Sequence, residues 1–407
     1  MGGIVASVLV ASPASADNIR EREYWLADYG VQTAWATSRG AGVTIAVIDT
    51  GVDGSHPDLT GTVIGGTDVS GIGSANGQTP VGDDRQHGTM VASLLAGHGH
   101  GVGDGILGVA PEAKILSVSV GFGVGSVGSD DQIAEGVRWS VDHGADIINM
   151  SLTRNTLDWP TSWDDAFLYA MEKGVIVVAA AGNRGSGTTE VGAPATMPGV
   201  VVVAGVDQSG TASFDASSQG ITLSVSAPSE GLVGAAPGGG YYSWAGTSGA
   251  TPLVAGVLAL IKASHPRLSA GNLINRLTAT ARSKGNPIVY GSGLFDASAA
   301  VSATVASVTT DPANELKDWI RLNRRAVASP EPTPTITPTP TRPPTPTVIA
   351  APVSPFGRVL PAVGDLRDIG IPVLVYAVFA TLLILVLRSI FREFTIFRQS
   401  QGSRRRP

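Results

Sequence analysis

Short apolar runs alternate with longer segments of helical character between residues 22 and 308. The apolar runs, rich in β-branched residues, predict strands over 43–48, 113–120, 146–150, 174–180 and 200–204. The segments between them predict helices over 88–96, 130–143 and 163–173. Alternating strands and helices indicate parallel strands joined by helices that cover both faces of a sheet. The pattern predicts an α/β domain whose chemistry lies at the carboxyl ends of its strands.

A second pattern near the C-terminus predicts a membrane helix. Residues Ile369–Leu387 form 19 consecutive positions without a charge, and a helix of that length rises about 28 Å, close to the thickness of a bilayer core. The basic tail 388–407 follows with net charge +5. The positive-inside rule then predicts a cytoplasmic tail and an extracytoplasmic position for residues 1–368. A buried helix of a globular domain is the alternative.

A proline-rich segment precedes this run. Residues 329–355 hold ten of the 26 prolines, many as Thr-Pro repeats, so the segment cannot form a packed core. In polyproline geometry it reaches roughly 80 Å, which predicts a stalk between the membrane and the globular domain. Residues 309–328 are interpreted as a connecting segment.

The N-terminal residues 1–16 resemble the end of a signal peptide. Ile4–Val10 is apolar, and Ala14-Ser15-Ala16 fits a cleavage site for export. A basic region before the apolar stretch is missing, so an N-terminal tail that is not cleaved is the alternative.

Composition removes several classes of function. The 407 residues contain no cysteine, which excludes disulfide scaffolds, thiolate metal sites and a cysteine nucleophile. The net charge of −6 argues against nucleic acid as a partner.

Three short segments carry candidate chemistry. Asp49 ends a buried strand, where an unpaired carboxylate is costly, although a role in the following turn is the simpler interpretation. His87 opens a helix of small and apolar residues. Ser248 lies at the N-terminus of another helix, where the dipole and free amides stabilise negative charge, although Thr247 or Ser248 could simply cap that helix.

Taken together, these segments resemble the subtilisin-like serine proteases (subtilases). The motifs Asp49-Thr50-Gly51, His87-Gly88-Thr89 and Gly246-Thr247-Ser248-Gly249-Ala250-Thr251-Pro252 occur once each and in the order of that family. The resemblance extends over about residues 25–305 and includes secondary motifs. These are His56-Pro57-Asp58-Leu59, Gly108-Val109-Ala110-Pro111, Asn149-Met150-Ser151-Leu152, Ala180-Ala181-Gly182-Asn183 and Gly291-Ser292-Gly293-Leu294-Phe295-Asp296.

The resemblance implies a subtilisin-like fold for a peptidase domain over residues 17–308, and a catalytic triad. Ser248 is implied as the nucleophile, His87 as the general base and Asp49 as the residue that orients and stabilises the imidazole. Asn183 is implied as the side-chain donor of the oxyanion hole, with the Ser248 amide as the second donor. Its place between Gly182 and Arg184 also predicts a left-handed turn residue.

The resemblance also implies where substrate binds. An extended peptide would pair with Ser151, Leu152 and Thr153, and the primary pocket would lie between these residues and Ala180, Ala181 and Gly182. Thr153 stands where the family commonly has glycine, so we expect it to narrow the cleft. Tyr241, Tyr242 and Trp244 are interpreted as packing residues.

No cofactor is expected, although the resemblance leaves calcium as a minor alternative. The glycine-rich loop Gly101–Gly105 matches a calcium site of many subtilases, and Asp58 matches a calcium carboxylate of that family. Val102 stands where the family often has a side-chain oxygen. His98 and His100 in the same loop have no obvious co-ligands for a transition metal.

The order of segments resembles the mycosins, the membrane-anchored subtilases of type VII secretion, although this chain lacks their cysteine pairs. Two functions stay open: an active endopeptidase of exported proteins at the cell membrane, or a structural component of a secretion-system membrane complex in which proteolysis is secondary. A freely secreted protease is a third alternative. The implied partners are protein or peptide substrates and the membrane.

Overall fold

The structure of the chain is a computed structural model that describes residues 18–124 and 127–324. Four predicted features lie outside these residues: the signal peptide 1–16, the stalk 329–355, the membrane helix 369–387 and the basic tail 388–407.

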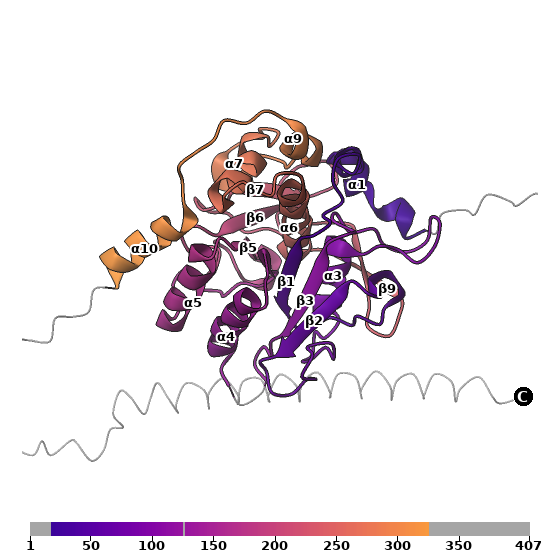
Figure 1. Cartoon of the computed structure of the whole chain (residues 1–407), viewed down its shortest axis with the longest axis horizontal. Helices are drawn as coiled ribbons and strands as arrows, with labels where there is room; N and C mark the ends of the chain where they lie inside the picture. The colour runs from indigo at the N-terminus through magenta and orange to yellow at the C-terminus, as the bar shows by residue number, and fades with distance from the viewer. Residues whose placement is uncertain (1–17, 125–126, 325–407) are drawn as a thin grey trace, which may run out of the picture. The chain divides into compact units, whose positions relative to one another are not determined.

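A seven-stranded parallel sheet forms the centre of the domain (Figure 1). Its order is β2-β3-β1-β4-β5-β6-β7. The strands are β1 (Thr44–Asp49), β2 (Val63–Asp68), β3 (Lys114–Ser119), β4 (Ile147–Met150), β5 (Ile176–Ala180), β6 (Val201–Val206) and β7 (Val225–Pro228). The five predicted strands correspond to β1 and β3–β6, so the α/β prediction with a parallel sheet is confirmed.

Successive side chains of a strand point to opposite faces of the sheet, and here they belong to two separate hydrophobic cores. In β1, Ile45 and Val47 enter one hydrophobic cluster, whereas Ala46 and Ile48 enter the other. A strand that is buried on both faces needs an uninterrupted apolar run, which is why the strands stand out in the sequence.

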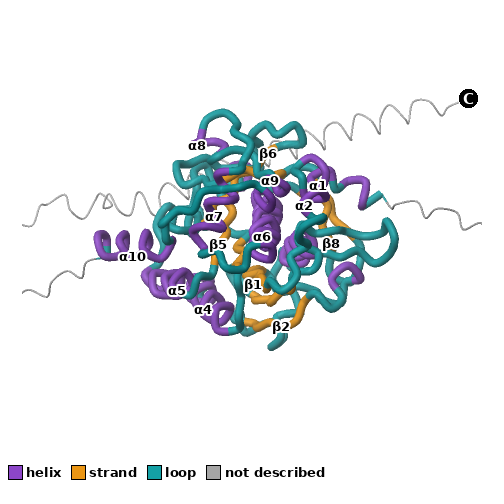
Figure 2. The backbone as a smooth tube through the Cα atoms, turned by 45° about the horizontal axis from the view of Figure 1, so that its top comes forward, coloured by secondary structure: helices purple, strands orange, loops and turns teal. Residues whose placement is uncertain are grey.

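Helices cover both faces of the sheet. The first cluster receives α3 (His87–Ala96), α6 (Thr247–Ser264), α7 (Ala270–Ala279) and α9 (Ala297–Ser302), together with the short N-terminal helices α1 (Tyr24–Asp28) and α2 (Val31–Ala34). The second receives α4 (Ser129–Asp142), α5 (Thr161–Glu172) and α10 (Pro312–Asn323). The short helix α8 (Pro287–Tyr290) lies in one of the long connections that Figure 2 shows between these elements.

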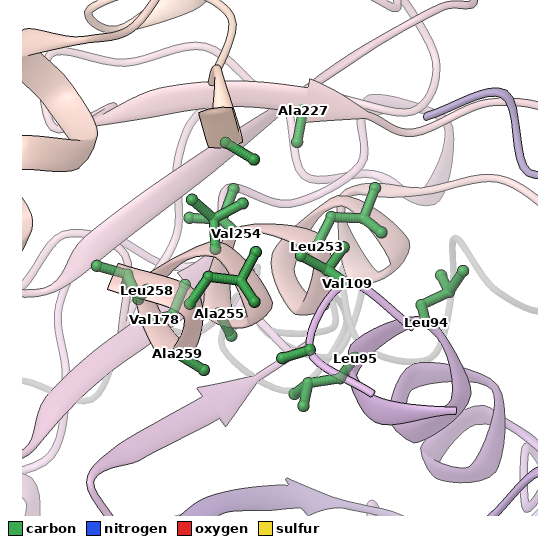
Figure 3. Packing of buried hydrophobic residues seen from close by; sticks show 14 of the residues in the cluster. Leu94, Leu95, Val109, Val178, Ala227, Leu253, Val254, Ala255, Leu258 and Ala259 are labelled. Carbon is green, nitrogen blue, oxygen red and sulfur yellow. The ribbon is translucent and has the colours of Figure 1, made fainter. Parts of the chain in front are cut away.

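Helix α6 is the central element of the first cluster. Its residues Leu253, Val254 and Leu258 are fully buried, and Figure 3 shows them packed among α3 and the strands. Among the described residues, α6 alone is long and apolar enough to cross a membrane. Because 78% of its apolar window is buried in this core, its hydrophobicity is explained by packing.

The strands that the sequence pattern missed lie at or beyond the edges of the sheet. β2 contains Gly65 and Gly66, and a methyl group on Gly66 would overlap the Ser117 carbonyl. β7 ends at Pro228, which an edge strand tolerates. The antiparallel hairpin of β8 (Leu232–Ala235) and β9 (Tyr241–Trp244) pairs apart from the main sheet.

The predicted connecting segment 309–328 contains the packed helix α10. Asp311 caps the helix by accepting a hydrogen bond from the Ala313 amide at 3.0 Å. Trp319 packs against Trp159 with ring centroids 4.2 Å apart and ring planes tilted by 38°, and Arg324 donates to Asp164 at 2.9 Å. The fold of the domain therefore extends to Arg324.

We predict that Leu316→Ala in α10 lowers the free energy of unfolding by about 2–5 kcal/mol, because Leu316 is fully buried against α5. Leu322→Ala is the matched control on the same helix; its side chain is exposed, and the change should stay within about 0.5 kcal/mol. Denaturant unfolding measures both. Equal effects would show that α10 is not packed on the domain.

Candidate active site

The candidate catalytic residues lie where strands end and helices begin. Asp49 is the last residue of β1, His87 is the first of α3, and Ser248 is the second of α6. Asn183 follows the end of β5 by three residues. His87, Asn183 and Ser248 line one cleft of about 460 Å³. The fold thus brings together residues that are up to 199 positions apart in the chain.

Asp49 holds the His87 imidazole. The Nδ1 atom of His87 lies 2.8 Å from Oδ1 and 2.9 Å from Oδ2 of the buried Asp49 carboxylate. Asp49 Oδ1 also accepts a hydrogen bond from the Thr50 amide at 2.7 Å, and Thr50 Oγ1 accepts one from the Gly88 amide at 3.0 Å. This geometry directs the other ring nitrogen, Nε2, away from Asp49.

The pKa of His87 is raised above its ordinary value of 6.5. Burial favours the neutral ring and lowers the pKa, but the charge of Asp49, its hydrogen bond and the more distant charge of Asp84 outweigh that effect. The ring is therefore tuned to accept a proton more readily than a free histidine.

Ser248 contacts Ser151 twice. Ser248 Oγ donates to the Ser151 carbonyl at 3.1 Å, and Ser151 Oγ donates to the Ser248 carbonyl at 2.8 Å. The simpler interpretation as a helix cap is wrong: the N-cap is Gly246, and neither Thr247 nor Ser248 provides a side-chain cap. Ser248 therefore does not cap the helix, and it lines the cleft.

Asn183 is oriented by Thr247. Asn183 Oδ1 accepts hydrogen bonds from the Thr247 amide at 2.8 Å and from Thr247 Oγ1 at 2.9 Å. The amide oxygen is thereby fixed, which leaves the Nδ2 group as the free donor. The expectation of a left-handed turn at Asn183 is wrong, because its φ is −117° and the adjacent Gly182 takes the positive φ of +103°.

Ala180, Ala181 and Gly182 form a rigid wall beside Asn183. Ala180 belongs to β5 and pairs with β6, and the Ala181 amide donates to the Val203 carbonyl at 3.0 Å. The Gly182 amide donates to Thr247 Oγ1 at 3.1 Å. A side chain at Gly182 would collide with Thr188, so glycine is required there.

Leu152 and Thr153 lie two and three residues after the end of β4. Leu152 packs against the second core, and Thr153 Oγ1 donates to the Arg154 carbonyl at 3.0 Å. Gly192 lies against both Thr153 Oγ1 and the Arg154 carbonyl, since a methyl group there would overlap them. Thr153 therefore fills space between two segments of chain.

Two aromatic residues line the cleft in addition to the predicted site. Trp244 lies edge-on to His87 with ring centroids 5.6 Å apart, and Tyr242 is more than half exposed. The packing interpretation holds for Tyr241 and Trp244, which are both partly buried against the first core. The sequence signal for Tyr242 and Trp244 was their position directly before the Ser248 motif.

The histidines of the 98–107 loop have local partners. His98 Nε2 lies 2.9 Å from the Thr60 carbonyl, and His100 Nδ1 lies 2.6 Å from Asp58 Oδ1. Within residues 18–124 and 127–324, no three His, Asp or Glu side chains come together as a ligand set for a metal.

Residues 40–293 match the subtilase family (Peptidase S8), which is more than half of the chain. This chain belongs to the subtilase family. It is 41% identical over 264 residues to subtilisin E of Bacillus subtilis, a match that covers 64% of this chain and 66% of that protein. It is 40% identical to subtilisin of Bacillus pumilus, with 64% and 91% covered. The similarity to these proteases supports a serine endopeptidase domain.

Solved structures of mycosins are also similar to this subtilase. MycP1 from Mycobacterium smegmatis is 29% identical with a TM-score of 0.61, and the match covers 72% of this chain and 88% of that one. The MycP3 protease from the type VII (ESX-3) secretion system is 30% identical with a TM-score of 0.59, over 73% and 91% of the two chains. These matches agree with the predicted resemblance.

We predict that kcat/KM for peptide hydrolysis by this subtilase falls as the pH is lowered, with a midpoint above pH 6.5, because the base must be neutral and the pKa of His87 is raised. Asp84→Asn removes a negative charge from the cleft and should move this midpoint to lower pH. Asp83→Asn is the control with the same change in net charge. The pH dependence of kcat/KM measures both, and identical profiles would refute the role of Asp84.

Proposed function

We propose that this subtilase is a serine endopeptidase that hydrolyses peptide bonds through Asp49, His87 and Ser248. The observation that carries the proposal is the pairing of His87 with the buried Asp49 carboxylate in the same cleft as Ser248. A serine hydroxyl needs a base to act as a nucleophile at neutral pH, and a base needs a fixed tautomer.

The proposed reaction begins when Ser248 Oγ turns from the Ser151 carbonyl to His87 Nε2. His87 takes the hydroxyl proton as Ser248 attacks the scissile carbonyl, and Asp49 stabilises the imidazolium that forms. His87 then gives the proton to the leaving amine. Water, activated by the same imidazole, releases the acyl group from Ser248.

Negative charge on the attacked oxygen would be stabilised by Asn183 Nδ2 and the Ser248 amide. Thr247 supports this role because its two hydrogen bonds to Asn183 Oδ1 fix the amide before substrate arrives. Donors that need no reorganisation are the effective ones, and losing one costs about 10²–10³ in turnover.

The substrate is proposed to be an extended peptide that pairs with Leu152 and Thr153. Within the described part of the chain, no backbone hydrogen bond to another loop or turn occupies their amides and carbonyls. Backbone pairing gives affinity with little sequence preference, so the primary pocket between Thr153 and Gly182 sets the preference.

We further propose that the domain is extracytoplasmic and is anchored in the cell membrane by Ile369–Leu387. The uncharged run and the +5 tail after it support this arrangement. The similarity to MycP1 and MycP3 supports a second candidate, a structural component of a type VII-like secretion complex in which proteolysis is secondary.

A fluorophosphonate probe that reacts with activated serines tests the proposed activity. Membranes that contain the full chain should be labelled, and Ser248→Ala should abolish labelling. His87→Ala should lower it strongly, because the serine loses its base. Labelling that survives Ser248→Ala, or an unlabelled but folded wild type, contradicts the mechanism. Loss of a secretion complex on deletion of the chain, but not in Ser248→Ala, would favour the structural role.

We predict that Thr153→Gly widens the primary pocket. Removing this side chain, whose Oγ1 lies against Gly192 and donates to the Arg154 carbonyl, should raise kcat/KM for a peptide with P1 phenylalanine, relative to P1 alanine, by about tenfold. Thr156→Gly changes an exposed threonine three positions along and should leave the ratio unchanged. An unchanged ratio in Thr153→Gly would remove Thr153 as a determinant of specificity.

A further inference from the structure

A guanidinium group lies inside the glycine-rich loop that connects α3 to β3. Arg20 Nη2 donates to the Asp104 carbonyl at 2.9 Å, and Arg20 Nε donates to the Gly105 carbonyl at 2.9 Å. The side chain of Arg20 is about four-fifths buried. Two carbonyls of this loop are thus directed at a cation that the N-terminal segment supplies.

Glu23 balances that cation from the same segment. Its side chain is fully buried, and Oε2 lies 3.1 Å from Arg20 Nε. Glu23 Oε1 accepts a hydrogen bond from the Leu107 amide at 2.8 Å. Burying one of these charges alone would be costly, whereas the pair is compensated and binds both ends of the 104–107 segment.

Asp58 closes the other side of the loop. It is fully buried, and its Oδ1 atom lies 2.6 Å from His100 Nδ1. Its Oδ2 atom accepts hydrogen bonds from the Ile106 amide and from the Tyr241 hydroxyl, both at 2.9 Å. Gly105 has a φ of +76°, and a side chain there would overlap Asp58 Oδ1, so the carboxylate and the loop backbone are in direct contact.

This arrangement does not fit the calcium ion that the family resemblance allows here. Calcium takes six to eight oxygen ligands. The Asp104 and Gly105 carbonyls already accept from Arg20, and both Asp58 oxygens already have N–H or O–H partners. Val102, where the family often has an oxygen ligand, is 86% exposed and apolar. Calcium could enter only by displacing these donors.

We infer that Arg20 is the resident cation of this loop and takes the structural role of a divalent ion. A bound ion stabilises a fold in proportion to the logarithm of its concentration, so a chelator removes its contribution. A covalently attached guanidinium contributes the same stabilisation at every calcium concentration. The fold of this subtilase is therefore independent of calcium, and its 98–107 loop depends on the N-terminal segment.

The same cluster extends to one wall of the cleft. Tyr241, which donates to Asp58, begins β9, and Trp244, which contacts His87, ends it. His56 Nε2 lies 3.2 Å from the Gly240 carbonyl at the start of this strand. Figure 1 shows the N-terminal helices on the same side of the domain as β9. Asp58 thus connects the loop that Arg20 holds to the first residue of β9.

Hydrogen exchange and thermal unfolding of the full chain test the inference. The wild type should unfold at the same temperature in excess CaCl2 and in excess EDTA. Arg20→Ala should lower Tm by about 3 °C or more. It should also speed amide exchange in residues 98–107 by about tenfold while leaving α4 unchanged. Arg20→Lys keeps the charge but loses the forked geometry of the guanidinium. Amide exchange in residues 98–107 of this variant should therefore be faster than in the wild type and slower than in Arg20→Ala.

Arg22→Ala is the matched control, because Arg22 is two residues away and makes an exposed hydrogen bond to Ser243. It should leave exchange in residues 98–107 unchanged. A wild-type Tm that falls in EDTA or rises with CaCl2 would overturn the inference, as would equal exchange in Arg20→Ala and Arg22→Ala. These measurements do not use proteolysis, so they stand or fall separately from the proposed activity.

Discussion

The buried carboxylate of Asp49 is the constraint on which the rest of the site depends. A carboxylate that is almost inaccessible to water must be matched by donors, and the structure supplies the Thr50 amide and the His87 ring. Meeting that requirement fixes where α3 begins relative to the end of β1. In this fold, the carboxyl edge of the parallel sheet brings the end of β1 and the starts of α3 and α6 to one place.

Helix α6 provides the second fixed point. It is buried on nearly all sides, so its position is determined by packing against both α3 and the sheet rather than by its own polarity. Thr247, in its first turn, then links the helix to the wall after β5 through Asn183 and Gly182. The same helix thus packs the core and orients Asn183, the proposed oxyanion donor.

The sequence predicted the elements whose pattern is local. The central strands are apolar on both faces, and the three motifs around Asp49, His87 and Ser248 are contiguous, so each was visible in the chain. The roles of Thr247, Trp244 and Arg20 were not, because each depends on a contact with a residue at least 60 positions away. Helix α10 was missed for a related reason, because the helix that it packs against, α5, lies elsewhere in the chain.

The end of α10 has a mechanical consequence. Arg324 donates to the Asp164 carboxylate and, at 2.7 Å, to the Trp159 carbonyl, while its guanidinium lies over the Trp159 and Trp319 rings. A force applied to the chain beyond Arg324 is therefore transmitted first to α10 and α5. These helices belong to the core layer opposite α3 and α6. Pulling on that end would detach α10 from the domain before the force reaches α3 and α6, the helices that carry His87 and Ser248.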